Sequence, residues 1–347
     1  MNTTTLPDEI RSEEELEELL TRPTDALIQA IRGVESPLVI LGAGGKMGPS
    51  LAVLAARAAE CAGHPLKIVA ASRFTNDSAR QLLEARGIRT VSVDILDRSQ
   101  LKQLPDTTNV LYLVGLKFGS STNPVPTWIT NTLGPITAAQ RFAGARFVAL
   151  STGNVYPFTP TDSGGSRESD RLDPVGEYAC AAVARERMFE YFADKDQTPC
   201  TLVRLNYAHD LRYGVISDLA QRIIMERPID VTMGHFNAIW QGDANDVILR
   251  CFELCSVPPS RLNLTSSETF SVRDVAGQLS ELMGKSVRFV GGESECALLS
   301  NASQCVKQFG QPATPVSKLI QWIAAWTLRG GKTLGKPTGF ESRDGRF

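Results

Sequence analysis

The chain is poor in the residues from which metal centres and disulfide frameworks are built. Its 347 residues include only three histidines, too dispersed to predict a metal site: His64, His209 and His235. The seven cysteines are odd in number and contain no Cys-x-x-Cys pair. We therefore expect these cysteines to be small buried hydrophobic residues of a protein kept in a reducing compartment.

The chain also lacks a charge excess and any long apolar run. It has 36 basic and 38 acidic side chains and an isoelectric point of about 6.0, so no nucleic-acid partner is predicted. No run approaches the roughly 18 apolar residues of a membrane span, and the N-terminus is polar and acidic, without the apolar core of an export signal. We expect a soluble, cytoplasmic protein that does not enter a membrane.

The most informative stretch covers residues 37–50. An apolar run at 38–41 is followed by Gly42, Gly45 and Gly48, and an amphipathic run begins at Leu51. Such glycines allow a positive φ, a close approach of backbone amides to a pyrophosphate, and tight packing of a helix on a strand. The pattern predicts a strand, a tight turn and a helix whose N-terminus binds the phosphates of a dinucleotide.

The end of the next predicted strand, residues 67–73, indicates which dinucleotide is bound. Folds that bind NAD place an acidic residue here to hydrogen-bond the ribose 2′-hydroxyl, whereas this chain has Ser72 and Arg73, a pair suited to a 2′-phosphate. The sequence therefore favours NADP(H). The alternative is a surface arginine beside a site that uses NAD.

Strands and helices continue to alternate along the first two thirds of the chain. Further strands are predicted at 90–95, 109–115, 146–150 and 201–206, with helical segments between them. This rhythm is typical of an α/β fold with a doubly wound parallel sheet, the Rossmann arrangement, here followed by a smaller C-terminal substrate lobe. Asp94, at the end of the third strand, is a candidate for contact with the adenine amino group, or else an ordinary turn residue.

The alternation of strands and helices also indicates how the chain is divided into domains. Residues 1–33 are predicted to be a helical extension, a solvated helix pair packed at the sheet edge, and residues 331–347 a tail that is either disordered or a strap over the cleft. The dinucleotide-binding domain is expected at 34–207, completed by about 237–267, and the substrate lobe at 208–236 and 268–330.

These motifs, in this order, resemble the extended short-chain dehydrogenase/reductase family, the NAD-dependent epimerases and dehydratases, whose best-known members are nucleotide-sugar epimerases. The resemblance covers roughly residues 36–280. It is carried by the glycine turn and by Asp94-Ile95, a Ser-Thr-x-x-Val-Tyr stretch at 151–156, Glu168, Pro174 and Tyr178, and Arg204 before Asn206.

The resemblance implies roles for individual residues. Thr152 would polarise the substrate oxygen, Tyr178 would be the acid/base, and Lys117 lies in a segment similar to one in which epimerases of the family contact the cofactor with a lysine. The residues that it implies for binding NADP, or NAD, are Gly42, Gly45, Lys46, Met47, Gly48, Ser72, Arg73, Asp94, Ile95, Gly115, Lys117, Asn131, Ser151, Tyr178 and Asn206. Relatives commonly form dimers, so a homodimer is expected.

The chain departs from the family at one catalytic position. Members usually carry Tyr-x-x-x-Lys, but Ala182 stands four residues after Tyr178. A phenol titrates near 10 unless a cation stabilises the phenolate, and losing one such stabiliser costs on the order of 10²–10³ in turnover. Lys117 is the favoured substitute and Arg185, on the same helix face, is the alternative. Lys117 could instead contact a phosphate or ribose without a catalytic part.

The residues after Thr152 favour some reactions over others. Dehydratases of the family place an acid there, whereas this chain has Gly153 and Asn154, which disfavours dehydration. We therefore expect an NADP(H)-dependent oxidoreductase or epimerase that acts on a hydroxyl or ketone of a small polar substrate of the nucleotide-sugar kind. The alternative is a catalytically degenerate NAD(P)H-binding sensor or scaffold, which the loss of the lysine would suit.

Overall fold

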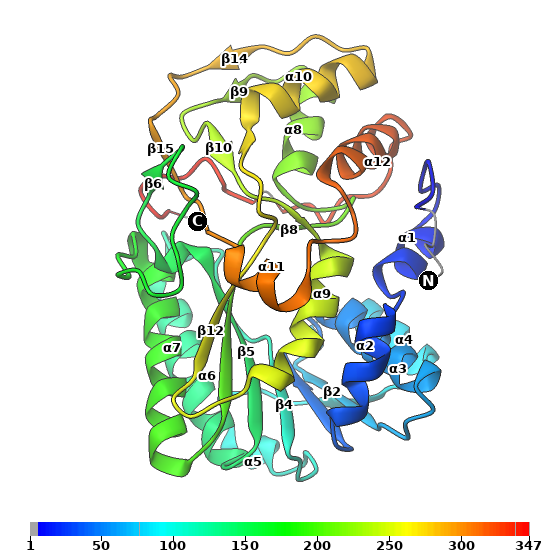
Figure 1. The fold of residues 1–347 in the computed structure, drawn as a ribbon, viewed down its shortest axis with the longest axis vertical. Coiled ribbons are helices and arrows are strands. Elements are labelled where there is room, and N and C mark those ends of the chain that lie inside the picture. Colours follow the sequence, from blue (N-terminus) through cyan, green and yellow to red (C-terminus); the bar gives the residue numbers. More distant parts are fainter. Residues whose placement is uncertain (1–5, 76, 337, 347) are drawn as a thin grey trace.

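A parallel sheet of seven strands forms one half of the molecule (Figure 1). The computed structural model describes residues 6–75, 77–336 and 338–346, so the ends of the predicted extension and tail (1–5 and 347) and Pro337 lie outside the described residues. In the order β12-β7-β5-β4-β1-β2-β3, the strands are Ser260–Leu264, Cys200–Leu205, Arg146–Thr152, Asn109–Tyr112, Leu38–Leu41, Ile68–Ser72 and Arg89–Ser92. The predicted doubly wound α/β fold is confirmed, and its strand order reverses between β1 and β4, where such folds bind ligands.

Both faces of this sheet are buried, which explains the uninterrupted apolar run of β1. Leu38 and Ile40 pack into a core that contains α3 (Gly48–Cys61) and α9 (Gln241–Arg250). Val39 and Leu41 point to the opposite core, which contains α6 (Pro124–Arg141) and α7 (Gly176–Asp196). A strand buried on both faces needs apolar residues at every position rather than at alternate ones.

The other half of the molecule is a lobe with its own hydrophobic core. Helices α8 (Val215–Ile224), α10 (Val272–Met283) and α12 (Val316–Leu328) surround Trp240 and Trp322, whose rings meet edge to face with centroids 5.6 Å apart. Trp326 is buried in the same core, as its spacing from Trp322 predicts. The short strands of this half pair as β8 (Ala208–His209) with β11 (Ile239–Trp240), β9 (Ile229–Asp230) with β14 (Phe289–Val290), β10 (His235–Phe236) with β13 (Phe270–Ser271), and β6 (Thr159–Pro160) with β15 (Cys296–Ala297).

Further α-helices are α4 (Asp77–Ala85), α5 (Arg98–Leu101) and α11 (Ser303–Phe309). Within the described residues, no helix combines the length and the apolar character that crossing a membrane requires. The seven cysteines are all free thiols. Cys200, Cys251 and Cys305 are buried as expected, whereas Cys61 is exposed at the end of α3.

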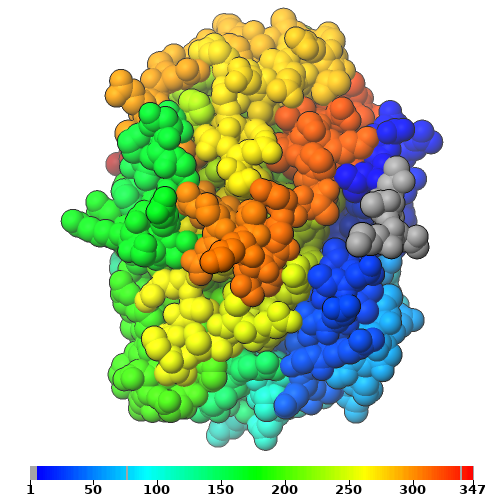
Figure 2. All heavy atoms as spheres, in the orientation of Figure 1, coloured from blue at the N-terminus to red at the C-terminus, as the bar shows by residue number. Residues whose placement is uncertain are grey.

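The N-terminal extension joins the two halves of the molecule. Helices α1 (Glu13–Leu20) and α2 (Asp25–Ala30) form where predicted, and the Thr24 hydroxyl accepts a hydrogen bond from the Leu27 amide as an N-cap. Leu16 of α1 is buried in the core of the lobe, whereas Leu27 of α2 is buried in the core beside the sheet. Figure 2 shows this segment in blue, running along the side of both halves. It is therefore not the solvated pair at the sheet edge that its acidic sequence suggests.

Candidate active site

The glycine turn after β1 has the backbone shape that a dinucleotide requires. Gly42 has a φ of +86°, and a Cβ there would lie 3.0 Å from the Val114 nitrogen. A Cβ on Gly48 would lie 2.4 Å from the Ala43 carbonyl oxygen, because α3 begins directly against the turn. The turn thus presents backbone and the N-terminus of a helix of 14 residues to the neighbouring cavity. This is the cradle that a pyrophosphate fits.

A first cavity of about 300 Å³, the glycine-turn cavity, lies beside this turn. Its lining residues come from the turn, from the ends of β2 and β4, and from the C-terminal segment. They are Leu41, Gly42, Gly44, Gly45, Ala71, Ser72, Arg73, Phe74, Thr75, Val93, Ile95, Leu113, Val114, Gly115 and Lys336. Asp94 is not among them, and its carboxylate instead accepts a hydrogen bond from the Leu96 amide at 3.0 Å, as a turn residue does.

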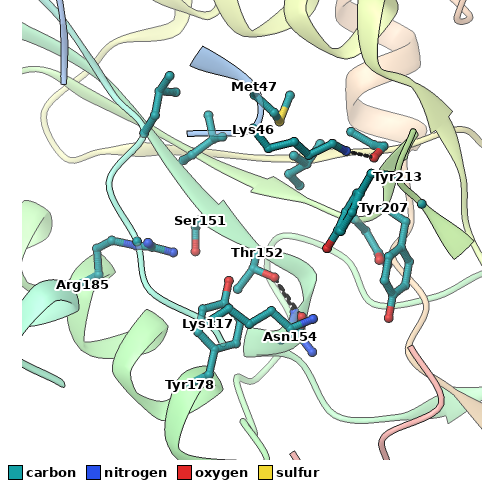
Figure 3. A pocket seen from close by; sticks show the side chains of 17 residues that line it. Lys46, Met47, Lys117, Ser151, Thr152, Asn154, Tyr178, Arg185, Tyr207 and Tyr213 are labelled. Atoms are coloured by element: carbon teal, nitrogen blue, oxygen red, sulfur yellow. Dashed lines mark hydrogen bonds between the residues drawn. The ribbon is translucent and has the colours of Figure 1, made fainter. Parts of the chain in front are cut away.

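A second cavity of about 240 Å³, the tyrosine cavity, adjoins the first and shares Leu113 and Gly115 with it (Figure 3). It brings together Tyr178 of α7, Thr152 at the end of β5 and Lys117 of the loop after β4. The full lining is Lys46, Met47, Leu113, Gly115, Lys117, Leu150, Ser151, Thr152, Asn154, Tyr178, Arg185, Leu205, Asn206, Tyr207, Ala208, Tyr213 and Gly214. The two cavities lie along the carboxyl ends of the strands, at the reversal of strand order.

Thr152 is held by its own loop. Its hydroxyl donates to Asn154 Oδ1 at 3.0 Å and accepts from the Asn154 amide at 3.2 Å (Figure 3). These bonds fix the hydroxyl on the wall of the tyrosine cavity, where Asn154 is also a lining residue. A hydroxyl held in this way can donate to a substrate oxygen by exchanging its Asn154 acceptor for that oxygen.

Lys117 lies close to Tyr178. Its Nζ is 5.9 Å from the centroid of the Tyr178 ring and donates to the Thr338 carbonyl oxygen at 2.9 Å. Burial lowers the pKa of Lys117 to about 8, and the nearby Asp218 carboxylate opposes that decrease. Lys117 is therefore charged at neutral pH and loses its charge a little above it.

Arg185 also reaches the tyrosine cavity. Its Nη1 donates to the Val114 carbonyl and to Asn131 Oδ1, both at 3.1 Å, and its Nε has no hydrogen-bond partner within the part of the chain that the structure describes. A Cβ on Gly115 would lie 2.5 Å from Arg185 Nη1, so the guanidinium occupies the space that a side chain at 115 would fill. Asn131, predicted to contact the cofactor, lies behind Arg185 and lines neither cavity.

A buried ion pair supports the floor of the tyrosine cavity. The Ser151 hydroxyl donates to Glu186 Oε1 at 2.5 Å, and Arg204 Nη2 lies 2.7 Å from Glu186 Oε2. Arg204 also donates to the Tyr156 hydroxyl at 2.7 Å, and burial raises the pKa of Tyr156 to about 12. The Ser-Thr-x-x-Val-Tyr stretch and Arg204 thus meet in one network beneath the cavity.

Sequence reasoning missed much of the far wall of the tyrosine cavity. Tyr207 and Tyr213 come from the segment between β7 and α8, and burial raises the pKa of both phenols. Tyr207 has a positive φ of 49°, a conformation that the local sequence does not predict. Lys46, predicted from the glycine turn, donates to the Ala208 carbonyl at 2.7 Å and lies 4.3 Å from the centroid of the Tyr213 ring. Burial lowers the pKa of Lys46 to about 8.

The fold and the two cavities define an α/β protein that binds a dinucleotide across the carboxyl ends of its strands. The family model described as the NAD dependent epimerase/dehydratase family matches residues 38–230, more than half of the chain. The chain belongs to this family, and it is an enzyme of the NAD(P)-dependent epimerase/dehydratase type. A search of curated proteins finds no sequence match.

Solved structures confirm the fold. An epimerase from Methanothermobacter thermautotrophicus is 17% identical with a TM-score of 0.74, covering 90% of this chain and 100% of that one. A dTDP-glucose 4,6-dehydratase from Bacillus anthracis in complex with NAD is 16% identical with a TM-score of 0.72, covering 85% and 97%. A UDP-glucuronic acid 4-epimerase from Bacillus cereus, in complex with UDP-glucuronic acid and NAD, is 16% identical with a TM-score of 0.71, covering 84% and 99%.

Proposed function

We propose that this chain is an NADP(H)-dependent oxidoreductase or epimerase that acts on a hydroxyl or ketone of a small, nucleotide-sugar-like substrate. The observation that carries the proposal is the shared wall of the two cavities. Tyr178, Thr152 and Lys117 line one cavity, and the glycine turn with Arg73 lines the other. Solved relatives of this fold are described as complexes with NAD and with UDP-sugars, which supports the substrate class.

Each side chain has a task that its position suits. Tyr178 passes a proton to or from the substrate oxygen, and the Thr152 hydroxyl donates a hydrogen bond to the same oxygen. Lys117, with its Nζ 5.9 Å from the centroid of the Tyr178 ring, places a positive charge beside the phenol. A nicotinamide held in the groove would supply the hydride chemistry at the carbon that carries this oxygen. Arg185 is the second cation available to the same wall, and its Nε has no partner among the residues that the structure describes.

The glycine-turn cavity supports NADP(H) over NAD. The described residues that line it include Arg73 and Lys336 but no aspartate or glutamate, so the acidic partner of a ribose 2′-hydroxyl is missing from this described lining. An arginine guanidinium suits a phosphate because its donors match two phosphate oxygens at once. Ser72, at the end of β2, adds a hydroxyl beside Arg73.

The test is a titration followed by a turnover assay. Purified protein is titrated with NADPH and with NADH while nicotinamide fluorescence is followed, and the expected result is tighter binding of NADPH. A panel of ketones, and of UDP-sugars for epimerisation, is then assayed for turnover. Binding without turnover on any member would favour the alternative of a degenerate sensor, and binding of neither dinucleotide would contradict both.

A further inference from the structure

The C-terminal strap, residues 331–336 and 338–346, is firmly attached to the lobe. The Leu334 amide donates to the Arg212 carbonyl at 3.0 Å, and both the amide and the hydroxyl of Thr338 donate to the Asp218 carboxylate, at 2.8 and 2.6 Å. Phe340 is buried in the core of the lobe, 6.4 Å from Phe236 between ring centroids. The strap therefore has a defined course rather than that of a loose tail.

The far end of the strap reaches the start of the helix that carries Tyr178. Arg343 donates to the Cys296 carbonyl at 2.8 Å. Gly345 then lies against the turn before α7, where a Cβ on Gly345 would come within 2.2 Å of the Val175 oxygen. Between its two ends the strap crosses the middle of the molecule, drawn in red in Figure 1, between the lobe and the sheet.

Two residues of the strap, Thr338 and Lys336, contribute to the candidate active site. The Thr338 carbonyl accepts the hydrogen bond from Lys117 Nζ, on the side of the tyrosine cavity. Two residues earlier, Lys336 lines the glycine-turn cavity together with Gly44, Gly45 and Arg73. A segment from the end of the chain thus contributes to the walls of a cavity otherwise built from residues 41–115.

We propose that Lys336 is a cofactor-binding residue, which adds a second cation beside Arg73 for a phosphate group of the dinucleotide. The residues that line this cavity carry two cations and no carboxylate, so the cavity selects an anion. A lysine ammonium is a compact donor suited to phosphate oxygens. The 2′-phosphate and the pyrophosphate share this chemistry, and both can reach the lining.

This inference rests on the proposed function, because it needs a phosphorylated dinucleotide in the groove. It adds to that function that the strap is part of the cofactor site, although it lies outside the nucleotide-binding segments of the sequence. Binding of the cofactor then holds the strap, and with it the Thr338 carbonyl that anchors Lys117.

The experiment measures the Kd of NADPH and of NADH for Lys336→Ala, Lys336→Arg and the wild type by nicotinamide fluorescence. Lys332→Ala is the matched control, because Lys332 lies in the same strap, is 78% exposed and lines neither cavity. We expect Lys336→Ala to raise the Kd of NADPH about tenfold, Lys336→Arg to keep it within about twofold, and the control to leave it unchanged.

The comparison of NADPH with NADH shows which phosphate group Lys336 contacts, because both carry the pyrophosphate but only NADPH carries the 2′-phosphate. A loss for NADPH alone assigns Lys336 to the 2′-phosphate, and an equal loss for both assigns it to the pyrophosphate. An unchanged Kd for both, in a wild type that binds NADPH, overturns the assignment of Lys336 and leaves the proposed function standing. If Lys336→Arg weakens NADPH binding as much as Lys336→Ala does, the assignment of Lys336 is also overturned, because a positive charge at position 336 would then not account for the binding. A wild type that binds neither dinucleotide overturns the proposed function itself.

Discussion

The two cavities of the groove are built in different ways. The glycine-turn cavity is formed mostly by backbone and small side chains of residues 41–115, which follow one another along consecutive strand ends. The tyrosine cavity includes polar side chains from β5, α7, the loop after β4, the segment after β7 and the glycine turn. Burial lowers the pKa of the two lysines in its lining, Lys46 and Lys117, to about 8. The first cavity therefore differs from the second in having a wall made largely of backbone and small residues, whereas the second gathers titratable side chains.

The largest expected effect tests whether the tyrosine cavity performs chemistry. Tyr178→Phe should lower turnover by roughly 10²–10⁴ and leave the Kd of NADPH nearly unchanged, because only the transferred proton is lost. Tyr191→Phe is the matched control, since Tyr191 lies on the same helix and is 56% exposed. Steady-state kinetics and fluorescence titration measure the two quantities. Equal turnover in both variants would remove Tyr178 from the reaction.

The second prediction concerns the stability of the cavity floor. Glu186→Gln should lower the free energy of unfolding by about 3 kcal/mol, because it leaves the buried Arg204 guanidinium without its anion. Arg187→Ala, which removes an exposed ion pair on the same helix, should cost less than about 1 kcal/mol. Urea denaturation measures both changes. Similar values for the two variants would show that the Glu186–Arg204 pair does not stabilise the fold.

The third prediction uses the pKa of Lys117. Because burial lowers that pKa to about 8, the lysine is charged below pH 8 and neutral above it, so the positive charge beside Tyr178 is lost as the pH rises through 8. Turnover should fall above about pH 8, and Lys117→Gln should turn over roughly 10–10² times more slowly without that fall. Lys117→Arg should restore part of the rate. If Lys46→Gln removes the fall instead, Lys46 is the titrating cation.

The smallest effect concerns the glycine-turn cavity. Arg73→Ala should weaken NADPH about tenfold and NADH little, because a single charged contact to the 2′-phosphate is removed. Arg89→Ala, an exposed residue of the neighbouring strand that lines neither cavity, should change neither Kd. Fluorescence titration measures the ratio of the two constants. An unchanged preference would exclude Arg73 from a phosphate site.

The sequence is a good guide to the fold and to the glycine-turn cavity for a physical reason. Apolar runs that end in glycine, and a residue pair such as Ser72-Arg73, carry their meaning within a few neighbouring positions. The sequence around Lys336 and around Tyr213 does not indicate that these residues line a cavity. Only the course of the strap and of the segment after β7 brings them there. Asp94 follows a strand, a position that suits both a ligand contact and a turn, and its neighbours in the sequence do not decide between the two.

Ala182, four residues after Tyr178, has apolar surroundings in the structure. It is fully buried against Val155 and Tyr156 and lines neither cavity. Position 182 is therefore filled by apolar packing, and a lysine introduced there would have to displace apolar neighbours. The cationic side chains that line the tyrosine cavity and could assist Tyr178 are Lys46, Lys117 and Arg185, the last of which lies on α7 itself.

The N-terminal helices have a consequence for motion. Helix α1 is anchored in one hydrophobic core and α2 in the other, and only residues 21–24 connect them. Four extended residues span roughly 14 Å at most, so this tether limits how far a hinge could open the molecule. Because the strap also contacts the lobe at Arg212 and Asp218 and the turn before α7 at Val175, we expect wide separation of the two halves to be restricted twice over.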